Sequence, residues 1–179
     1  MKIVIAPDSF KETLSAFEVA STIESSFQNV FPEAEIIKIP IADGGEGTVD
    51  AMVSATNGSL MFSEVEGPMG EITRAKWGML GNSKTAVIEI AEACGLHLVQ
   101  ANKRNPMTAS SFGVGQLVVA ALDKGAKKII IGLGGSATND GGYGFAESGF
   151  RYQSGGTDLG SLGDATLTYN SRATTITIL

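Results

Sequence analysis

Short apolar runs and one amphipathic segment set the pattern at the start of the chain. Residues 2–6 form a continuous apolar run of the kind found in buried parallel strands. Residues 16–30 carry apolar side chains at helical spacing, and Ser15 and Glu18 fit a capping box at the start of this helix. Residues 36–41 read as a second strand. Strand, helix and strand in this order predict a βαβ unit.

The pattern changes beyond residue 58, where apolar segments are joined by turns rich in glycine, proline and asparagine. Such turns predict an antiparallel meander, which a helix and further strands then follow. We expect strands over 60–66, 71–80, 84–90 and 127–132, a helix over 112–124 and an edge strand over 173–179. This change of style predicts three parts: an α/β portion over 1–65, part of a second α/β domain over 66–150, and a tail over 151–179.

Composition narrows the classes of function. The chain has 179 residues, of which 43% are hydrophobic and 18% charged, with a net charge of −6. An acidic chain without a basic run is not expected to bind nucleic acid. No apolar stretch is long enough to cross a membrane or to serve as a signal-peptide core, so we expect a cytoplasmic protein. The sequence has one cysteine, Cys94, and one histidine, His97, which excludes an internal disulfide and a multi-histidine metal site.

Three loops carry candidate chemistry, and each follows a predicted strand or opens a predicted helix. In an open α/β sheet the ligand crevice lies at the carboxyl ends of the strands, so these loops are expected to face one site. The first loop, residues 8–11, combines an acid, a hydroxyl and a lysine. This set can face a magnesium ion and a phosphate, or Asp8 and Ser9 can simply bond their own turn.

The second loop, residues 43–48, is rich in glycine and leads into a helix. Glycine lets backbone N–H groups approach an anion, and the helix N-terminus adds partial positive charge. Its two acids, Asp43 and Glu46, would repel a bare phosphate, so they indicate either a bridging Mg²⁺ or a proton acceptor for a hydroxyl. The alternative is structural: Asp43 caps the helix and Glu46 lies in its first turn.

The third loop, residues 134–142, holds four glycines, two hydroxyls, an amide and an acid. It is dense in donors with little steric bulk, as an anion cradle requires, although glycine clusters also mark ordinary turns. It is neither a Walker A motif nor a dinucleotide fingerprint. A weaker candidate is Arg104, which either clamps a carboxylate or lies on the surface.

Taken together, these loops resemble the glycerate kinase family of the bacterial glycerate 2-kinase type. The matching text lies in residues 2–12, 40–48 and 132–142, with further similarity at 67–70 and 104–106. The resemblance extends over residues 1–150. It implies a fold with a Rossmann-like or flavodoxin-like parallel sheet and a second α/β domain inserted in its chain. Family members are about twice as long, so we expect a truncated form of this fold.

The resemblance also implies an activity: transfer of a phosphoryl group from ATP to D-glycerate, with Mg²⁺, in the cytoplasm. In this hypothesis Lys11 neutralises phosphate oxygens, and Asp43, or alternatively Asp8, orients or deprotonates the substrate hydroxyl. Glu46 and Asp140 are the expected metal ligands. Substrate or phosphate contacts are expected from Ser9, Gly44, Gly45, Gly47, Thr48, Arg104, Gly134, Gly135, Ser136, Thr138 and Asn139.

Two alternatives stay open at this point. The chain can be a non-catalytic fragment that binds an anion or a nucleotide, or it can be a kinase of another small hydroxy acid. The Thr/Ile-rich segment at 173–179 could pair edge to edge with a second copy, which makes a homodimer a further expectation.

Overall fold

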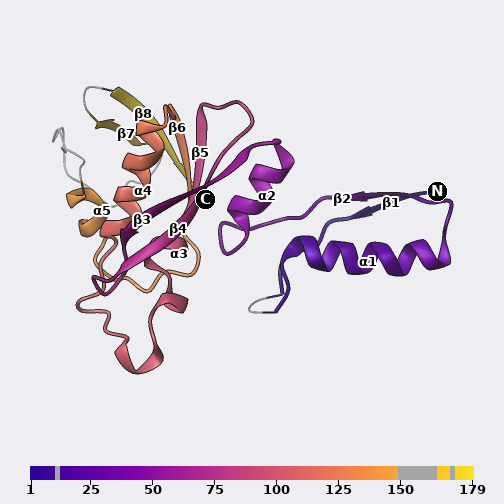
Figure 1. Cartoon of the computed structure of the whole chain (residues 1–179), viewed down its shortest axis with the longest axis horizontal. Helices are drawn as coiled ribbons and strands as arrows, with labels where there is room; N and C mark the ends of the chain where they lie inside the picture. Colours follow the sequence, from indigo (N-terminus) through magenta and orange to yellow (C-terminus); the bar gives the residue numbers. More distant parts are fainter. Residues whose placement is uncertain (11–12, 149–164, 170–171) are drawn as a thin grey trace.

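The computed structural model describes residues 1–10, 13–148, 165–169 and 172–179, and the elements fall into two sheets (Figure 1). The smaller sheet pairs β1 (Lys2–Ile5) with β2 (Glu35–Lys38) in parallel, and α1 (Ala16–Val30) connects them. The larger sheet has six strands in the order β3-β4-β5-β6-β8-β7. This mixed α/β architecture confirms the predicted fold class and the predicted βαβ unit.

The larger sheet is antiparallel at its beginning and parallel at its centre. β3, β4 and β5 form the antiparallel meander that the turn residues predicted, whereas β5, β6 and β8 run parallel. The bounds of its strands are β3 Ser59–Glu66, β4 Ile72–Met79, β5 Thr85–Glu89, β6 Lys128–Gly132, β7 Ala165–Tyr169 and β8 Arg172–Ile178. The prediction of an edge strand at 173–179 is wrong, because β8 lies between β6 and β7.

Helices cover both faces of the larger sheet, as the alternation along β5 shows. Ile88, with no exposed surface, packs in a cluster with Leu117 of α4 (Phe112–Asp123). Its neighbour Val87 points to the opposite face and packs with Val49 of α2 (Thr48–Ala55). Because successive side chains of a strand alternate between faces, β5 is buried on both sides.

Shorter helical segments complete the connections. These are α3 (Ala91–Cys94), α5 (Tyr143–Glu147) and two 3₁₀ turns, η1 (Leu96–Leu98) and η2 (Ala101–Lys103). His97 lies in the η1 turn. The capping box at α1 is confirmed, since the Ser15 hydroxyl accepts the Glu18 N–H at 3.2 Å and the Glu18 carboxylate accepts the Ser15 N–H at 2.8 Å.

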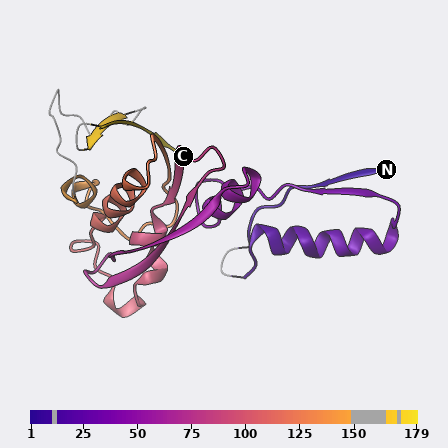
Figure 2. The same cartoon turned by 45° about the horizontal axis from the view of Figure 1, so that its top comes forward.

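The β1–α1–β2 unit extends to one side of the larger sheet (Figures 1 and 2). α1 covers one face of its two strands, so Ile5 is only 5% exposed. Val4 points to the other face and is 56% exposed, and its partner across the register is Ile37. One face of a parallel pair is therefore open, although parallel strands in proteins usually have both faces covered.

Within the described ranges, no helix is long and apolar enough to cross a membrane. The division into parts at residues 65 and 150 stays a prediction, and β3 already begins at Ser59. Of the predicted tail over 151–179, residues 151–164 lie outside the described residues.

Candidate active site

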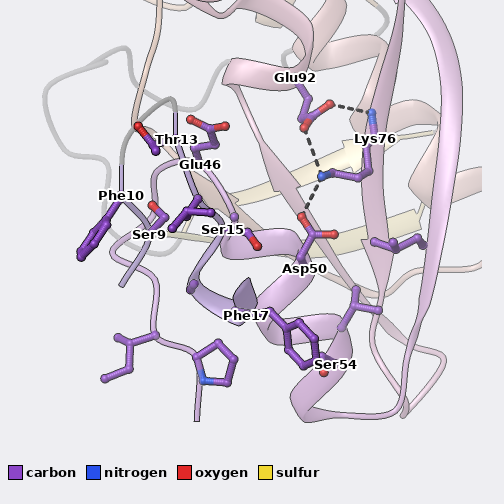
Figure 3. Close-up of a pocket in the computed structure, with 18 residues that line it drawn as sticks. Ser9, Phe10, Thr13, Ser15, Phe17, Glu46, Asp50, Ser54, Lys76 and Glu92 are labelled. Atoms are coloured by element: carbon purple, nitrogen blue, oxygen red, sulfur yellow. Dashed lines mark hydrogen bonds and ion pairs between the residues drawn. The ribbon is translucent and has the colours of Figure 1, made fainter. Parts of the chain in front are cut away.

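A cavity of about 740 Å³ lies where the β1–α1–β2 unit meets the larger sheet (Figure 3). Its walls come from the loop after β1, the start of α1, the second loop with α2, and the strand β4. The polar and charged side chains in its lining are Ser9, Thr13, Ser15, Glu46, Asp50, Ser54, Lys76 and Glu92. The first and second loops therefore face one space, as the sequence predicted.

A half-buried ion-pair network forms one wall of this cavity. The Nζ atom of Lys76 lies 2.7 Å from Asp50 Oδ2 and 3.6 Å from Glu92 Oε1 (Figure 3). Burial alone would lower the pKa of Lys76, but the hydrogen bond to Asp50 and the charges of Glu92, Asp50 and Glu89 outweigh it and raise the pKa. Lys76 therefore stays charged at neutral pH. Sequence reasoning missed this network, since its members come from α2, β4 and α3.

Glu46 presents a carboxylate to the same cavity. Its side chain is exposed, and none of the described residues forms a hydrogen bond or ion pair with that carboxylate. The described residues that line the cavity thus carry three carboxylates and one ammonium group, that of Lys76. An anionic ligand would need an additional positive charge to enter this space.

Internal hydrogen bonds fix the shape of the second loop. Two of its glycines, Gly44 and Gly47, have φ values of +91° and +93°, a region that side chains with a Cβ rarely occupy. The Thr48 hydroxyl donates to the Gly45 carbonyl at 2.7 Å and accepts the Gly44 N–H at 3.1 Å. Thr48 is only 2% exposed, so its hydroxyl braces the loop instead of lying open to a ligand.

Asp43 lies exposed in the second loop. Its Oδ1 atom accepts the N–H of Gly45 at 3.0 Å, an Asx-type turn that holds the carboxylate in place. Asp8 also bonds its own loop, where its Oδ1 accepts the N–H of the adjacent Ser9 at 2.7 Å. Each acid thus bonds its own loop through one oxygen. Lys11, the predicted phosphate contact, lies outside the described residues.

A buried carboxylate that the sequence did not single out occupies the N-terminus of α2. Glu89, the last residue of β5, is 2% exposed. Its Oε1 accepts the Val49 N–H at 2.6 Å and its Oε2 accepts the Gly47 N–H at 3.3 Å. The sequence suggested that this helix end offers its N–H groups to a phosphate. In the structure two of those groups already bind Glu89.

The third loop packs directly against the second. The Gly134 N–H donates to the Gly44 carbonyl at 3.1 Å. A Cβ atom on Gly134 would lie 2.5 Å from Gly45 Cα, and one on Gly132 would lie 2.4 Å from the Gly44 oxygen. Only glycine permits so close an approach of two backbones. Two of the three predicted loops therefore touch, although the third contributes none of the described residues that line the cavity.

Within the third loop, the hydroxyls of Ser136 and Thr138 lie 2.8 Å apart and bond each other. Gly135 adopts a φ of +78°, and its carbonyl accepts the Leu96 N–H at 2.9 Å. Asn139 is exposed. These contacts tie the loop to the segment after α3, while Gly135 and Asn139 stay exposed.

Asp140 joins two helix starts. Its Oδ2 accepts the N–H and the hydroxyl of Ser111, each at 2.8 Å, and the Gly144 N–H at 3.2 Å, while its Oδ1 accepts the Gly142 N–H at 3.1 Å. Burial would raise the pKa of Asp140, but these hydrogen bonds outweigh it and lower the pKa. The carboxylate thus links the starts of α4 and α5, which accounts for it without a metal.

Arg104 lies on the surface, where its Nε donates to the Val99 carbonyl at 3.2 Å. This agrees with the surface alternative for Arg104 and places it away from the described cavity lining. Among the described residues, no group of three or more histidine, cysteine, aspartate or glutamate side chains could hold a metal ion. A Mg²⁺ ion is commonly held by one or two carboxylates together with substrate phosphates, and the exposed Glu46 carboxylate fits that requirement.

Comparisons of the sequence with a family profile and with curated proteins lead to the same family. A profile of the glycerate kinase family matches residues 3–174, which is beyond residue 150, where we expected the resemblance to end. The chain is 54% identical over 167 residues to the glycerate kinase of Bacillus subtilis and 56% identical over 148 residues to the glycerate 2-kinase of Escherichia coli. The alignments cover 92% and 83% of this chain but 44% and 39% of those relatives.

The fold agrees with a solved structure. A crystal structure assigned to glycerate kinase 2 of Salmonella typhimurium is 52% identical and superposes with a TM-score of 0.74. The match covers 83% of this chain and 40% of that chain. The chain therefore spans about two fifths of the length of the relatives it matches.

Proposed function

The chain belongs to the glycerate kinase family, and from this premise we propose that its three loops serve the ATP-dependent phosphorylation of D-glycerate. The observation that carries the proposal is the contact between Gly44 and Gly134, which joins two of the family's glycine-rich loops beside a cavity that also receives the first loop. A cytoplasmic location and a homodimer stay predictions.

In this reaction a hydroxyl oxygen of glycerate forms a bond to the γ-phosphorus of ATP. The bond from that phosphorus to the oxygen bridging the β- and γ-phosphates breaks, the hydroxyl proton leaves, and phosphoglycerate and ADP are released. The transition state is loose, so the protein contributes mainly by positioning the reactants and by neutralising charge. The three loops are suited to these two tasks.

Asp43 is our proposed acceptor of the hydroxyl proton. The Gly45 N–H holds one carboxylate oxygen, and none of the described residues bonds the other, Oδ2, which is the atom left to take the proton. An exposed carboxylate at the end of a short turn can reach a substrate hydroxyl without large movement. Asp8, one of whose carboxylate oxygens accepts the N–H of the adjacent Ser9, is the alternative acceptor.

Glu46 is the residue we propose to hold Mg²⁺, because its carboxylate faces the cavity without a partner among the described residues. When bound, Mg²⁺ would neutralise charge on the phosphate oxygens. The acidic cavity wall makes such a positive charge necessary. Lys11 stays the predicted second source of it. The backbone of the third loop, around Ser136 and Thr138, is proposed to face the phosphates or the glycerate carboxylate.

An assay of ADP release with D-glycerate, ATP and Mg²⁺ tests the proposal. We expect glycerate-dependent turnover that falls on the order of a hundredfold in Asp43→Asn, since general-base catalysis typically contributes at least that much. Asp123→Asn, an exposed acid at the end of α4, is the matched control and should keep the parent rate.

Three outcomes would contradict the proposal. Equal rates in Asp43→Asn and the parent chain would remove Asp43 from its role. Calorimetry that shows nucleotide binding without glycerate-dependent turnover would identify a non-catalytic binding fragment. Faster turnover of another small hydroxy acid would replace glycerate as the substrate.

A further inference from the structure

Glu89 stands out among the buried groups that the proposed chemistry does not use. It ends the central strand β5 and is 2% exposed, yet both oxygens of its carboxylate accept N–H groups from another part of the chain. Those N–H groups belong to Gly47 and Val49, which flank the last residue of the second loop. A buried carboxylate is costly unless it is hydrogen-bonded, so this placement is a specific one.

The pattern of donors favours the ionised form of the acid. Each oxygen accepts an N–H, and both oxygens of a carboxylate are strong acceptors, whereas the hydroxyl oxygen of the protonated acid is a weaker one. A glutamine would direct its NH₂ group toward one of these donors. The negative charge also lies at the positive end of the α2 dipole, which stabilises it.

The contacts of Glu89 determine where the second loop points. Gly47 takes a left-handed conformation at the junction of loop and helix, and its N–H is held by Glu89 Oε2. Glu46 immediately precedes this junction and faces the cavity, while Asp43 lies three residues further back. A rotation of the start of α2 relative to β5 would therefore change the directions of the Asp43 and Glu46 side chains.

From these contacts we propose that Glu89 is a positioning residue, which in its ionised form holds the loop 43–48 so that Asp43 and Glu46 face the substrate. It does not touch the substrate itself. This inference rests on the proposed function of the loop.

The surroundings of Glu89 make its charge sensitive to acid. Burial raises its pKa, and the neighbouring Glu92 carboxylate raises it further. The Val49 and Gly47 N–H groups and the Lys76 ammonium act in the opposite direction, and Lys76 is itself shared with Asp50. The net direction is upward, so the loop is expected to lose this anchor in mild acid.

NMR of the whole chain provides the first test. In the parent chain, the amide shifts of Gly47 and Val49 should titrate together with the Glu89 carboxyl carbon, at a midpoint above 4.5, the ordinary glutamate value. In Glu89→Gln this titration should vanish, and the two amides should exchange with solvent roughly tenfold faster, as expected for the loss of one hydrogen bond. Glu64→Gln on β3 is the exposed control and should change neither.

Turnover provides the second test. The acid limb of the kcat profile of the parent chain should share the midpoint of the Gly47 and Val49 amide titration. The thermal unfolding temperature should not fall across that midpoint, because protonation of an acid whose pKa is raised in the folded state does not lower stability. A loss of rate that came from unfolding would lower the unfolding temperature together with the rate. Amide shifts that do not follow the Glu89 carboxyl carbon in the parent chain would overturn the inference, even if Glu89→Gln fails to fold.

The outcomes separate the two proposals. If the parent chain shows no glycerate-dependent turnover, the proposed function fails, and the NMR titration alone decides whether Glu89 anchors the loop. If turnover is present and its acid limb lies away from the amide midpoint, Glu89 has no positioning role and the proposed function stands.

Discussion

The N–H of Gly134 and the carbonyl of Gly44 form a 3.1 Å hydrogen bond between two loops that lie 90 residues apart in sequence. Both residues are glycines without side chains, so the backbones of the two loops pack directly against each other. The contact places the start of α2 beside the end of β6. It makes the two glycine-rich loops one structural unit, and changes in one loop should be felt in the other.

The first prediction concerns this contact. Gly134→Ala would place a Cβ 2.5 Å from Gly45 Cα, so one backbone has to move. We expect a loss of about 1–3 kcal/mol in the free energy of unfolding, the usual cost of overpacking. Urea unfolding measures it. The control is Gly70→Ala, where the added Cβ meets nothing within 4 Å and only the positive φ is strained. A free energy of unfolding for Gly134→Ala within about 0.5 kcal/mol of the parent chain would refute the close contact.

The second prediction concerns the open face of the β1–β2 pair. Ile5→Ala should lower the free energy of unfolding by about 2–4 kcal/mol, because Ile5 is buried against α1. Val4→Ala, one residue away and 56% exposed, should change it by less than about 0.5 kcal/mol. Urea unfolding compares the two variants. A similar loss at Val4 would show that something covers this face in solution.

The third prediction concerns the cation in the cavity wall. Lys76 holds Asp50 at 2.7 Å and Glu92 at 3.6 Å, so its loss leaves two carboxylates without their shared partner beside the cavity. We expect Lys76→Gln to weaken ATP binding about tenfold by calorimetry, because the two carboxylates, no longer neutralised, would repel the phosphates. Lys84→Gln, at an exposed position just before β5, removes the same charge elsewhere. A similar loss in that variant would point to net charge instead of the cavity.

The fourth prediction concerns Asp140. Asp140→Ala should destabilise the fold by about 1 kcal/mol, because it removes the acceptor for N–H groups at the starts of α4 and α5. The pKa of Asp140 is lowered in the folded state, so its contribution is fully present above the ordinary value of 3.8 and is lost as pH falls through the folded pKa. The difference between parent and variant should therefore shrink in acid.

Thermal unfolding of both chains between pH 7 and pH 2 measures this difference. If Asp140→Ala leaves stability unchanged but alters the Mg²⁺ dependence of turnover, the metal role expected from the sequence is correct and the capping account is not.

The sequence by itself determined most of the regular elements and the three glycine- or acid-bearing loops of this protein. The capping box of Ser15 and Glu18, the apolar run of β1 and the meander turns depend on residues within a few positions of each other, so local pattern is enough to predict them. The glycine-rich loops were recognisable for the same reason. Even the family could be identified from the text of three short segments.

Only the tertiary structure decided which groups the acidic side chains contact. Glu89 belongs to a strand by its pattern, and its role follows from Val49, which lies 40 residues earlier. Lys76 reaches the cavity because β4 pairs with β3 and β5, and β8 is internal because β7 adds beyond it. Strand pairing and backbone packing bring these groups together. Such contacts depend on the whole folded chain, and no local spacing encodes them.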